Sequence, residues 1–84
     1  MEFTEIMTEI RERIFEISGI EPEEIPDDAS LINDIGLSSL ETMTLLDALE
    51  ERYSKRLSVR DLRVIVTVRD LALFFAAEGG EGAS

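Results

Sequence analysis

Three short motifs set where helices begin in this sequence, and they constrain its fold more than any other feature. Each motif places a serine or threonine three residues before an acid: Ser38 and Glu41, Ser58 and Asp61, Thr67 and Asp70. In such a capping box the hydroxyl accepts a hydrogen bond from the third N–H of the helix, and the acid accepts one from the capping residue. We therefore predict helices that begin after residues 38, 58 and 67, the last two spanning Val59–Ile65 and Val68–Ala77.

A further helix is predicted at the N-terminus from the spacing of apolar residues. Apolar side chains recur there every three or four positions, which places them on one helical face. These residues are Phe3, Ile6, Met7, Ile10, Ile14 and Ile17. Gly19 follows as a residue suited to a left-handed helix end, and Ile20 is the apolar residue that often packs beside such a cap.

The segment of residues 20–38 is expected to be a long loop held down by its own apolar residues. Pro22 and Pro26 exclude a continuous helix through it. The residues available to dock are Ile20, Ile25, Leu31, Ile35 and Leu37. We expect a short helical turn near Ala29–Ile32, and a close approach of the loop to the next helix at Gly36.

These elements predict an all-α fold, a four-helix bundle with a long first loop and a short third helix. Residues 64–66 favour a strand, but a single strand without a partner is not stable, so they are interpreted as helix end or extended linker. The bundle is expected to span residues 1–77, followed by a flexible tail at residues 78–84.

Composition excludes most catalytic chemistry. The 84 residues include no cysteine and no histidine, which removes the usual nucleophile–base pairs and the commonest zinc ligands. The spacing of a calcium-binding loop is not found from Asp27 or Asp28, and we predict no metal site. No apolar run is long enough to span a bilayer and the N-terminus is acidic, so we expect a cytoplasmic monomer without membrane association.

Charge indicates the kind of partner. Nineteen acids and eight bases give a net charge of -11, which repels nucleic acid and attracts basic protein surfaces. The distribution is uneven. Residues 1–51 contain fifteen acids and two bases, whereas residues 52–69 contain six bases and one acid.

The helix that follows Ser38 has a core face and a second, mixed face. At about 100° per residue, its core face comprises Thr42, Leu45, Leu46, Leu49 and Tyr53. Leu40 and Met43 lie off this face among acids, and an apolar centre with a charged rim suits transient docking. The predicted partner-docking residues are Leu40, Met43, Glu41, Asp47 and Glu51, with Glu50 beside them.

Ser39 is the candidate site residue. It follows the helix-capping Ser38, and a phosphate ester on Ser39 would meet free backbone N–H groups and the positive end of the helix dipole. The same two serines also fit an ordinary helix start. The local feature alone leaves both interpretations open.

The longer stretch from Asp34 to Tyr53 resembles the acyl and peptidyl carrier protein family. The likeness consists of a glycine, a Ser-Leu pair, and a helix ending in Ala-Leu-Glu-Glu and an aromatic residue. It extends to the amphipathic first helix, to Leu31 in the loop, and to the segment from Thr67 to Leu71.

This resemblance implies a carrier function. Ser39 would receive a 4′-phosphopantetheine arm from coenzyme A through a phosphopantetheinyl transferase. The thiol of the arm would hold an acyl or aminoacyl group as a thioester for separate loading and processing enzymes. The protein itself would not be an enzyme. Leu45, Leu46, Leu49, Ile65 and Phe75 would form the core, or else open as a cleft for the cargo.

Two departures from the family pattern bear on the pathway. Ser38 stands where fatty-acid carriers usually have aspartate, and residues 52–69 are basic. Both favour polyketide, nonribosomal peptide or related specialised biosynthesis over fatty acid biosynthesis. The alternative hypothesis is an unmodified acidic helical adaptor that binds a basic protein through the helix beginning at Ser39.

Overall fold

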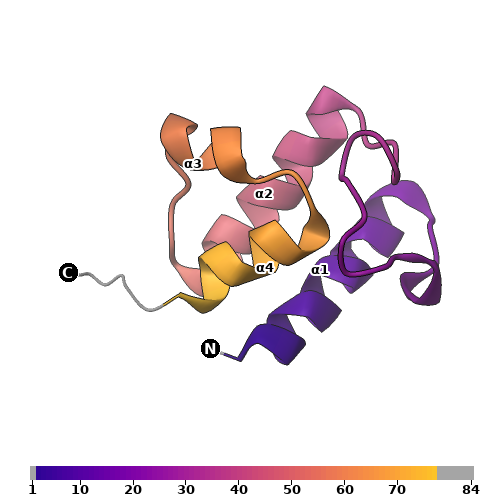
Figure 1. Cartoon of the computed structure of the whole chain (residues 1–84), viewed down its shortest axis with the longest axis horizontal. Coiled ribbons are helices and arrows are strands. Elements are labelled where there is room, and N and C mark those ends of the chain that lie inside the picture. The colour runs from indigo at the N-terminus through magenta and orange to yellow at the C-terminus, as the bar shows by residue number, and fades with distance from the viewer. Residues whose placement is uncertain (1, 78–84) are drawn as a thin grey trace.

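The computed structural model describes residues 2–77, and within that range the chain is helical, with four α-helices and one 3-10 turn. They are α1 (Phe3–Ser18), η1 (Pro22–Glu24), α2 (Ser39–Tyr53), α3 (Val59–Val64) and α4 (Val68–Ala76). Helix α1 packs against both α2 and α4, while α3 lies on the opposite side of the molecule from α1 (Figure 1). The predicted all-α, four-helix fold is confirmed. The predicted tail at residues 78–84 lies outside the described residues.

The core is formed by three of the four helices together with the long loop. The buried apolar residues of the helices are Ile6, Met7, Ile10 and Ile14 from α1, Leu45, Leu46 and Leu49 from α2, and Val68, Leu71, Ala72 and Phe75 from α4. The loop adds Ile25, Ala29, Leu31 and Leu37. Helix α3 contributes none. Among the described residues no polar or charged side chain is buried, so the core is held by apolar packing. None of the described helices has the length and apolar character needed to cross a membrane.

All three predicted capping boxes form, and they begin α2, α3 and α4. At α4 the Asp70 carboxylate accepts hydrogen bonds from the N–H groups of Val66 and Thr67, both at 3.0 Å. These bonds hold the pKa of Asp70 below its usual value. Gly19 ends α1 with φ of 82°, and its N–H donates to Phe15 O at 2.8 Å, as predicted for a left-handed cap.

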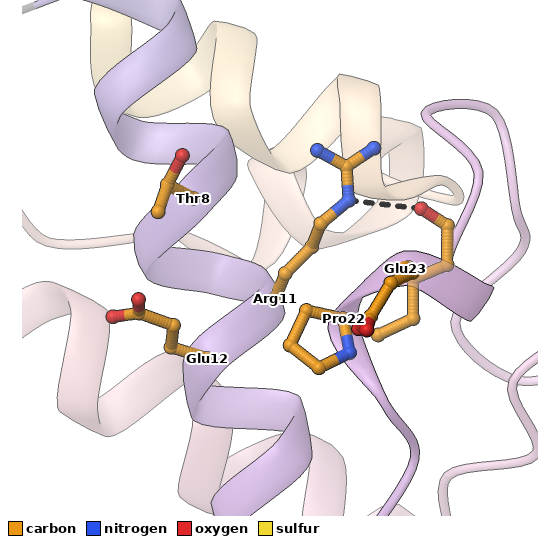
Figure 2. Close-up of a pocket in the computed structure, with 6 residues that line it drawn as sticks. Thr8, Arg11, Glu12, Pro22 and Glu23 are labelled. Atoms are coloured by element: carbon orange, nitrogen blue, oxygen red, sulfur yellow. Dashed lines mark hydrogen bonds between the residues drawn. The ribbon is translucent and has the colours of Figure 1, made fainter.

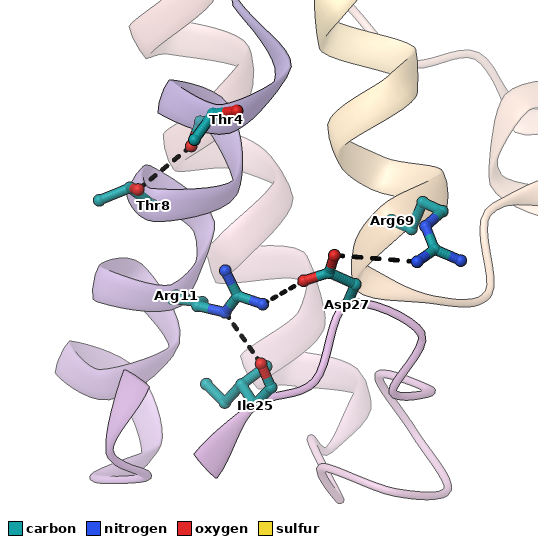
Figure 3. Close-up of polar contacts among 6 residues, drawn as sticks. All are labelled: Thr4, Thr8, Arg11, Ile25, Asp27 and Arg69. Carbon is teal, nitrogen blue, oxygen red and sulfur yellow. Dashed lines mark hydrogen bonds and ion pairs between the residues drawn. The ribbon is translucent and has the colours of Figure 1, made fainter. Parts of the chain in front are cut away.

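Arg11 on α1 pins the long loop to the bundle. Its Nε donates to Ile25 O at 2.9 Å, and its side chain forms one wall of a surface hollow that Pro22 also lines (Figure 2). The guanidinium also pairs with Asp27, whose other oxygen lies 3.8 Å from Arg69 of α4 (Figure 3). Asp27 therefore links the loop to two helices at once.

The loop is also paired through its backbone with the chain just before α4. Leu31 N–H donates to Val66 O at 3.0 Å, and Val68 N–H donates to Ala29 O at 3.0 Å. Ser30 and Thr67 form an isolated antiparallel bridge. Residues 65–66 are therefore an extended linker, as the sequence allowed, and their partner is the loop.

One detail of the loop prediction was wrong, and another was shifted in position. A hydrogen-bonded turn lies close to the predicted Ala29–Ile32, where Asp34 N–H donates to Ser30 O at 3.1 Å, but the regular helical turn of the loop is the 3-10 turn at Pro22–Glu24. Proline fits the first position of a helical turn, whereas the backbone of Ala29 and Leu31 is paired with the segment before α4. Gly36 is needed for its φ of +82°, not for a close approach, because a Cβ there would meet no atom within 4 Å.

Candidate functional site

Ser38 and Ser39 have different roles at the start of α2. The Ser38 hydroxyl accepts a hydrogen bond from Glu41 N–H at 3.1 Å, and Glu41 Oε1 accepts one from Ser38 N–H at 3.0 Å. Ser38 is therefore the helix cap, as predicted. Ser39 is the first residue of α2 and is exposed, and within residues 2–77 its hydroxyl has no hydrogen-bond partner. Of the two hydroxyls, the one on Ser39 is available for chemistry.

The surroundings of Ser39 suit a phosphate ester. The first N–H groups of a helix have no intrahelical acceptor, and the dipole of a fifteen-residue helix places partial positive charge there. The box satisfies the N–H of Glu41, whereas those of Ser39 and Leu40 have no acceptor within residues 2–77. An anionic group on the Ser39 oxygen would be stabilised without any change in the fold.

The outer face of α2 continues from Ser39 along the helix. Leu40 is 77% exposed and Met43 is 53% exposed, although both are large apolar residues. Asp47 and Glu51 are exposed on the same side of the helix. Leu40 does not pack under the preceding loop, so an apolar pair flanked by acids faces solvent next to Ser39.

Glu41 and Glu50 are engaged within the chain. Glu41 belongs to the capping box on another side of α2. The Glu50 carboxylate accepts a hydrogen bond from the N–H of Leu57 at 2.5 Å, and so fixes the turn between α2 and α3. This role of Glu50 has no signal in the sequence, because the bond joins positions seven residues apart across an irregular turn.

An apolar groove of about 470 Å³ begins at Ser39 and runs between α2, the loop and α3. Its apolar lining comes from Leu31, Ile32, Met43, Leu46, Leu62, Ile65 and Val66. Of the residues predicted as core or cleft, Leu46 and Ile65 line this groove, while Leu45, Leu49 and Phe75 are fully buried in the core. The sequence did not indicate Ile32, Leu62 or Val66, because they come from three separate segments that only the fold brings together.

The comparisons with known proteins agree with this geometry. A family model described as "Phosphopantetheine attachment site" matches residues 3–75. Proteins named "Acyl carrier protein" from Bradyrhizobium sp. (strain ORS 278), Nitrobacter hamburgensis and Rhodopseudomonas palustris are each similar to this chain. Each is 39% identical over 72 residues, which cover 81% of this chain and 91% of the relative.

An exposed serine at the start of α2, in a four-helix fold, is what these comparisons lead one to expect. The chain belongs to the phosphopantetheine-binding acyl carrier protein family. It is therefore a carrier and not an enzyme, and its cofactor is covalently attached 4′-phosphopantetheine. A phosphopantetheinyl transferase and acyl-processing enzymes are its partners.

Proposed function

We propose that Ser39 is the residue to which the arm is attached. The free hydroxyl of Ser39, beside a Ser38 hydroxyl that is already used in the cap, carries this proposal. When attached, the arm supplies a thiol that holds an acyl or aminoacyl group as a thioester. Ser39 lies at the edge of the apolar groove, so a chain that leaves its oxygen can follow either the groove or solvent.

We propose that partner enzymes dock on the outer face of α2. Leu40 and Met43 provide the apolar contact beside Ser39, and Asp47 and Glu51 provide negative charge that attracts a basic partner. Glu41, also predicted for docking, serves the helix cap in this proposal. A rigid helix that carries both the attachment residue and the contact surface fixes the position of the arm relative to the partner.

We propose further that the carrier is a cytoplasmic monomer working in polyketide, nonribosomal peptide or related specialised biosynthesis. Ser38 supports the pathway proposal because it caps α2 without the negative charge of an aspartate. The six bases of residues 52–69 support it as well. Loading from coenzyme A supports a cytoplasmic location, and a core that is complete within the described chain supports a monomer.

The test is loading with coenzyme A and a broad-specificity phosphopantetheinyl transferase, followed by intact mass. The wild-type protein is expected to gain one phosphopantetheine group, and Ser39→Ala none. Ser38→Ala is the matched control: it loses the cap, at a cost of about 1 kcal/mol in stability, yet still gains the group.

Loading of Ser39→Ala, or no loading of the wild type, would refute Ser39 as the attachment residue. The adaptor alternative makes a different prediction. A basic partner would then bind the unmodified protein in a salt-sensitive way, and binding would be equal for the wild type and Ser39→Ala.

A further inference from the structure

Helix α3 presents a face of valines and arginines that is separate from the outer face of α2. At about 100° per residue, positions 59, 60, 63 and 64 fall within about 140° of one another. We define these residues, Val59, Arg60, Arg63 and Val64, as the α3 face. Val59 is 72% exposed and Val64 is 70% exposed, and both arginines are exposed. The position of α3 in Figure 1 leaves this helix accessible at one side of the molecule.

The fold does not require this face. Helix α3 has no buried residue, and the chain on either side of it is anchored by the half-buried Leu57 and Ile65. The capping box of Ser58 and Asp61 fixes its first turn. Two valines with most of their surface in water gain little from the folded state, since apolar stabilisation scales with the area buried.

The charge of the α3 face is not matched by an ion pair in the described part of the chain. Within residues 2–77, no carboxylate lies in ion-pair contact with Arg60 or Arg63. Asp61 lies on another side of α3, and its carboxylate accepts a hydrogen bond from Ser58 N–H at 2.9 Å. Arg56 differs from these arginines because it lines a hollow together with Asp47 and Glu51. Two of the six bases of residues 52–69 therefore lie exposed on α3, outnumbering its one acid, Asp61.

We propose that the α3 face is a docking surface for an acidic, partly apolar surface of another protein. Charge complementarity selects an acidic occupant, and the valines select one with apolar side chains between its acids. A membrane or a nucleic acid presents an extended array of negative charge, which the net charge of -11 opposes. A protein surface can place its acids against two arginines alone.

Helix α3 lies next to the groove that begins at Ser39. Leu62, on the inner side of α3, lines the groove that begins at Ser39, so α3 is the outer wall of that groove. A protein bound to the α3 face would lie on the side of α3 that faces away from this groove, and its contacts would differ in charge from those on α2. The carrier would thus present two surfaces of opposite sign to two classes of partner.

The test uses the full chain labelled with nitrogen-15 and two synthetic amphipathic helical peptides. The acidic peptide has a leucine face and a glutamate face, and the basic peptide has lysine in place of each glutamate. The acidic peptide is expected to shift the amide resonances of residues 59–64, and the basic peptide those of residues 39–53. Arg60→Glu and Arg63→Glu are each expected to weaken binding of the acidic peptide about three- to tenfold. Arg52→Glu changes the net charge equally, lies outside the α3 face, and is expected to change binding by less than about twofold.

Several results would overturn the proposal. Acidic-peptide shifts on α2, or equal weakening by Arg52→Glu and Arg63→Glu, would remove the assignment to α3. Shifts of residues 59–64 caused by phosphatidylglycerol vesicles and not by the acidic peptide would assign the face to a lipid surface. Concentration-dependent shifts without peptide would assign it to a second copy of the chain. The peptide titrations are made on the protein before and after it is loaded with phosphopantetheine. Binding at α3 can then be judged separately from the attachment of the arm at Ser39.

Discussion

Helices α2 and α3 begin with the same device and present opposite surfaces beside the same groove. Ser38 and Ser58 each accept a hydrogen bond at 3.1 Å from the N–H three residues on, and the N–H of each serine donates to the acidic side chain at that position. The two helices differ in how much of their surface is buried. Helix α2 buries Leu45, Leu46 and Leu49, whereas α3 buries nothing.

This difference shows that the start of a helix and its attachment to the core have separate causes. The capping box decides where a helix begins, but buried area decides how firmly the helix is held. Helix α2 is fixed by the core and carries the acidic outer face and Ser39 on a rigid support. Helix α3 is held by its cap and its flanking residues, and it offers a basic face with exposed valines. The two predictions below test these differences, beginning with the larger effect.

The largest expected difference between the two helices is in core packing. Leu49→Ala on α2 should lower the free energy of unfolding by about 2–5 kcal/mol, because Leu49 is fully buried and the truncation leaves a cavity. Val64→Ala on α3 should change it by less than about 0.5 kcal/mol. Urea denaturation of the two variants measures both values. Equal losses would mean that α3 is part of the core.

A smaller effect is expected when acid loosens α3, the helix that has a capping box but no buried residue. The hydrogen bond from Ser58 N–H holds the pKa of Asp61 below its ordinary value of 3.8. The charged form therefore favours the folded helix above pH 3.8, and this contribution is lost as the pH falls through the lowered pKa. As the pH falls below 3.8, the Cα chemical shifts of residues 59–64 should move toward coil values. Those of residues 39–53 should stay at their helical values.

Asp61→Asn serves as the control for this acid transition. It should loosen α3 already at neutral pH and remove the transition below pH 3.8. An acid transition in α3 that persists in Asp61→Asn would show that another group causes it.

The local parts of this structure could be predicted from the sequence. The three capping boxes, the Gly19 helix end and the buried leucines of α2 each depend on residues within a few positions of one another. Ser39 could be singled out for the same reason, since its position at a helix start is a local property.

The long-range parts could not be predicted. Asp27 joins Arg11 to Arg69 across three elements, and the groove brings Ile32 and Leu62 together from a loop and a helix. The turn expected near Ala29–Ile32 does not become a regular helix because the backbone of Ala29 and Leu31 is paired with residues near 67, and nothing within the loop indicates that pairing. Such contacts depend on the register of segments far apart in the chain.

The difference between two adjacent hydroxyls is the central claim, and peptide mapping by tandem mass spectrometry tests it most directly. The wild-type protein, loaded once, is digested, and the modified residue is located within the peptide that contains both Ser38 and Ser39. The account predicts that all of the phosphopantetheine lies on Ser39, because the Ser38 hydroxyl is occupied in the cap. Phosphopantetheine on Ser38, or divided between the two serines, would contradict it.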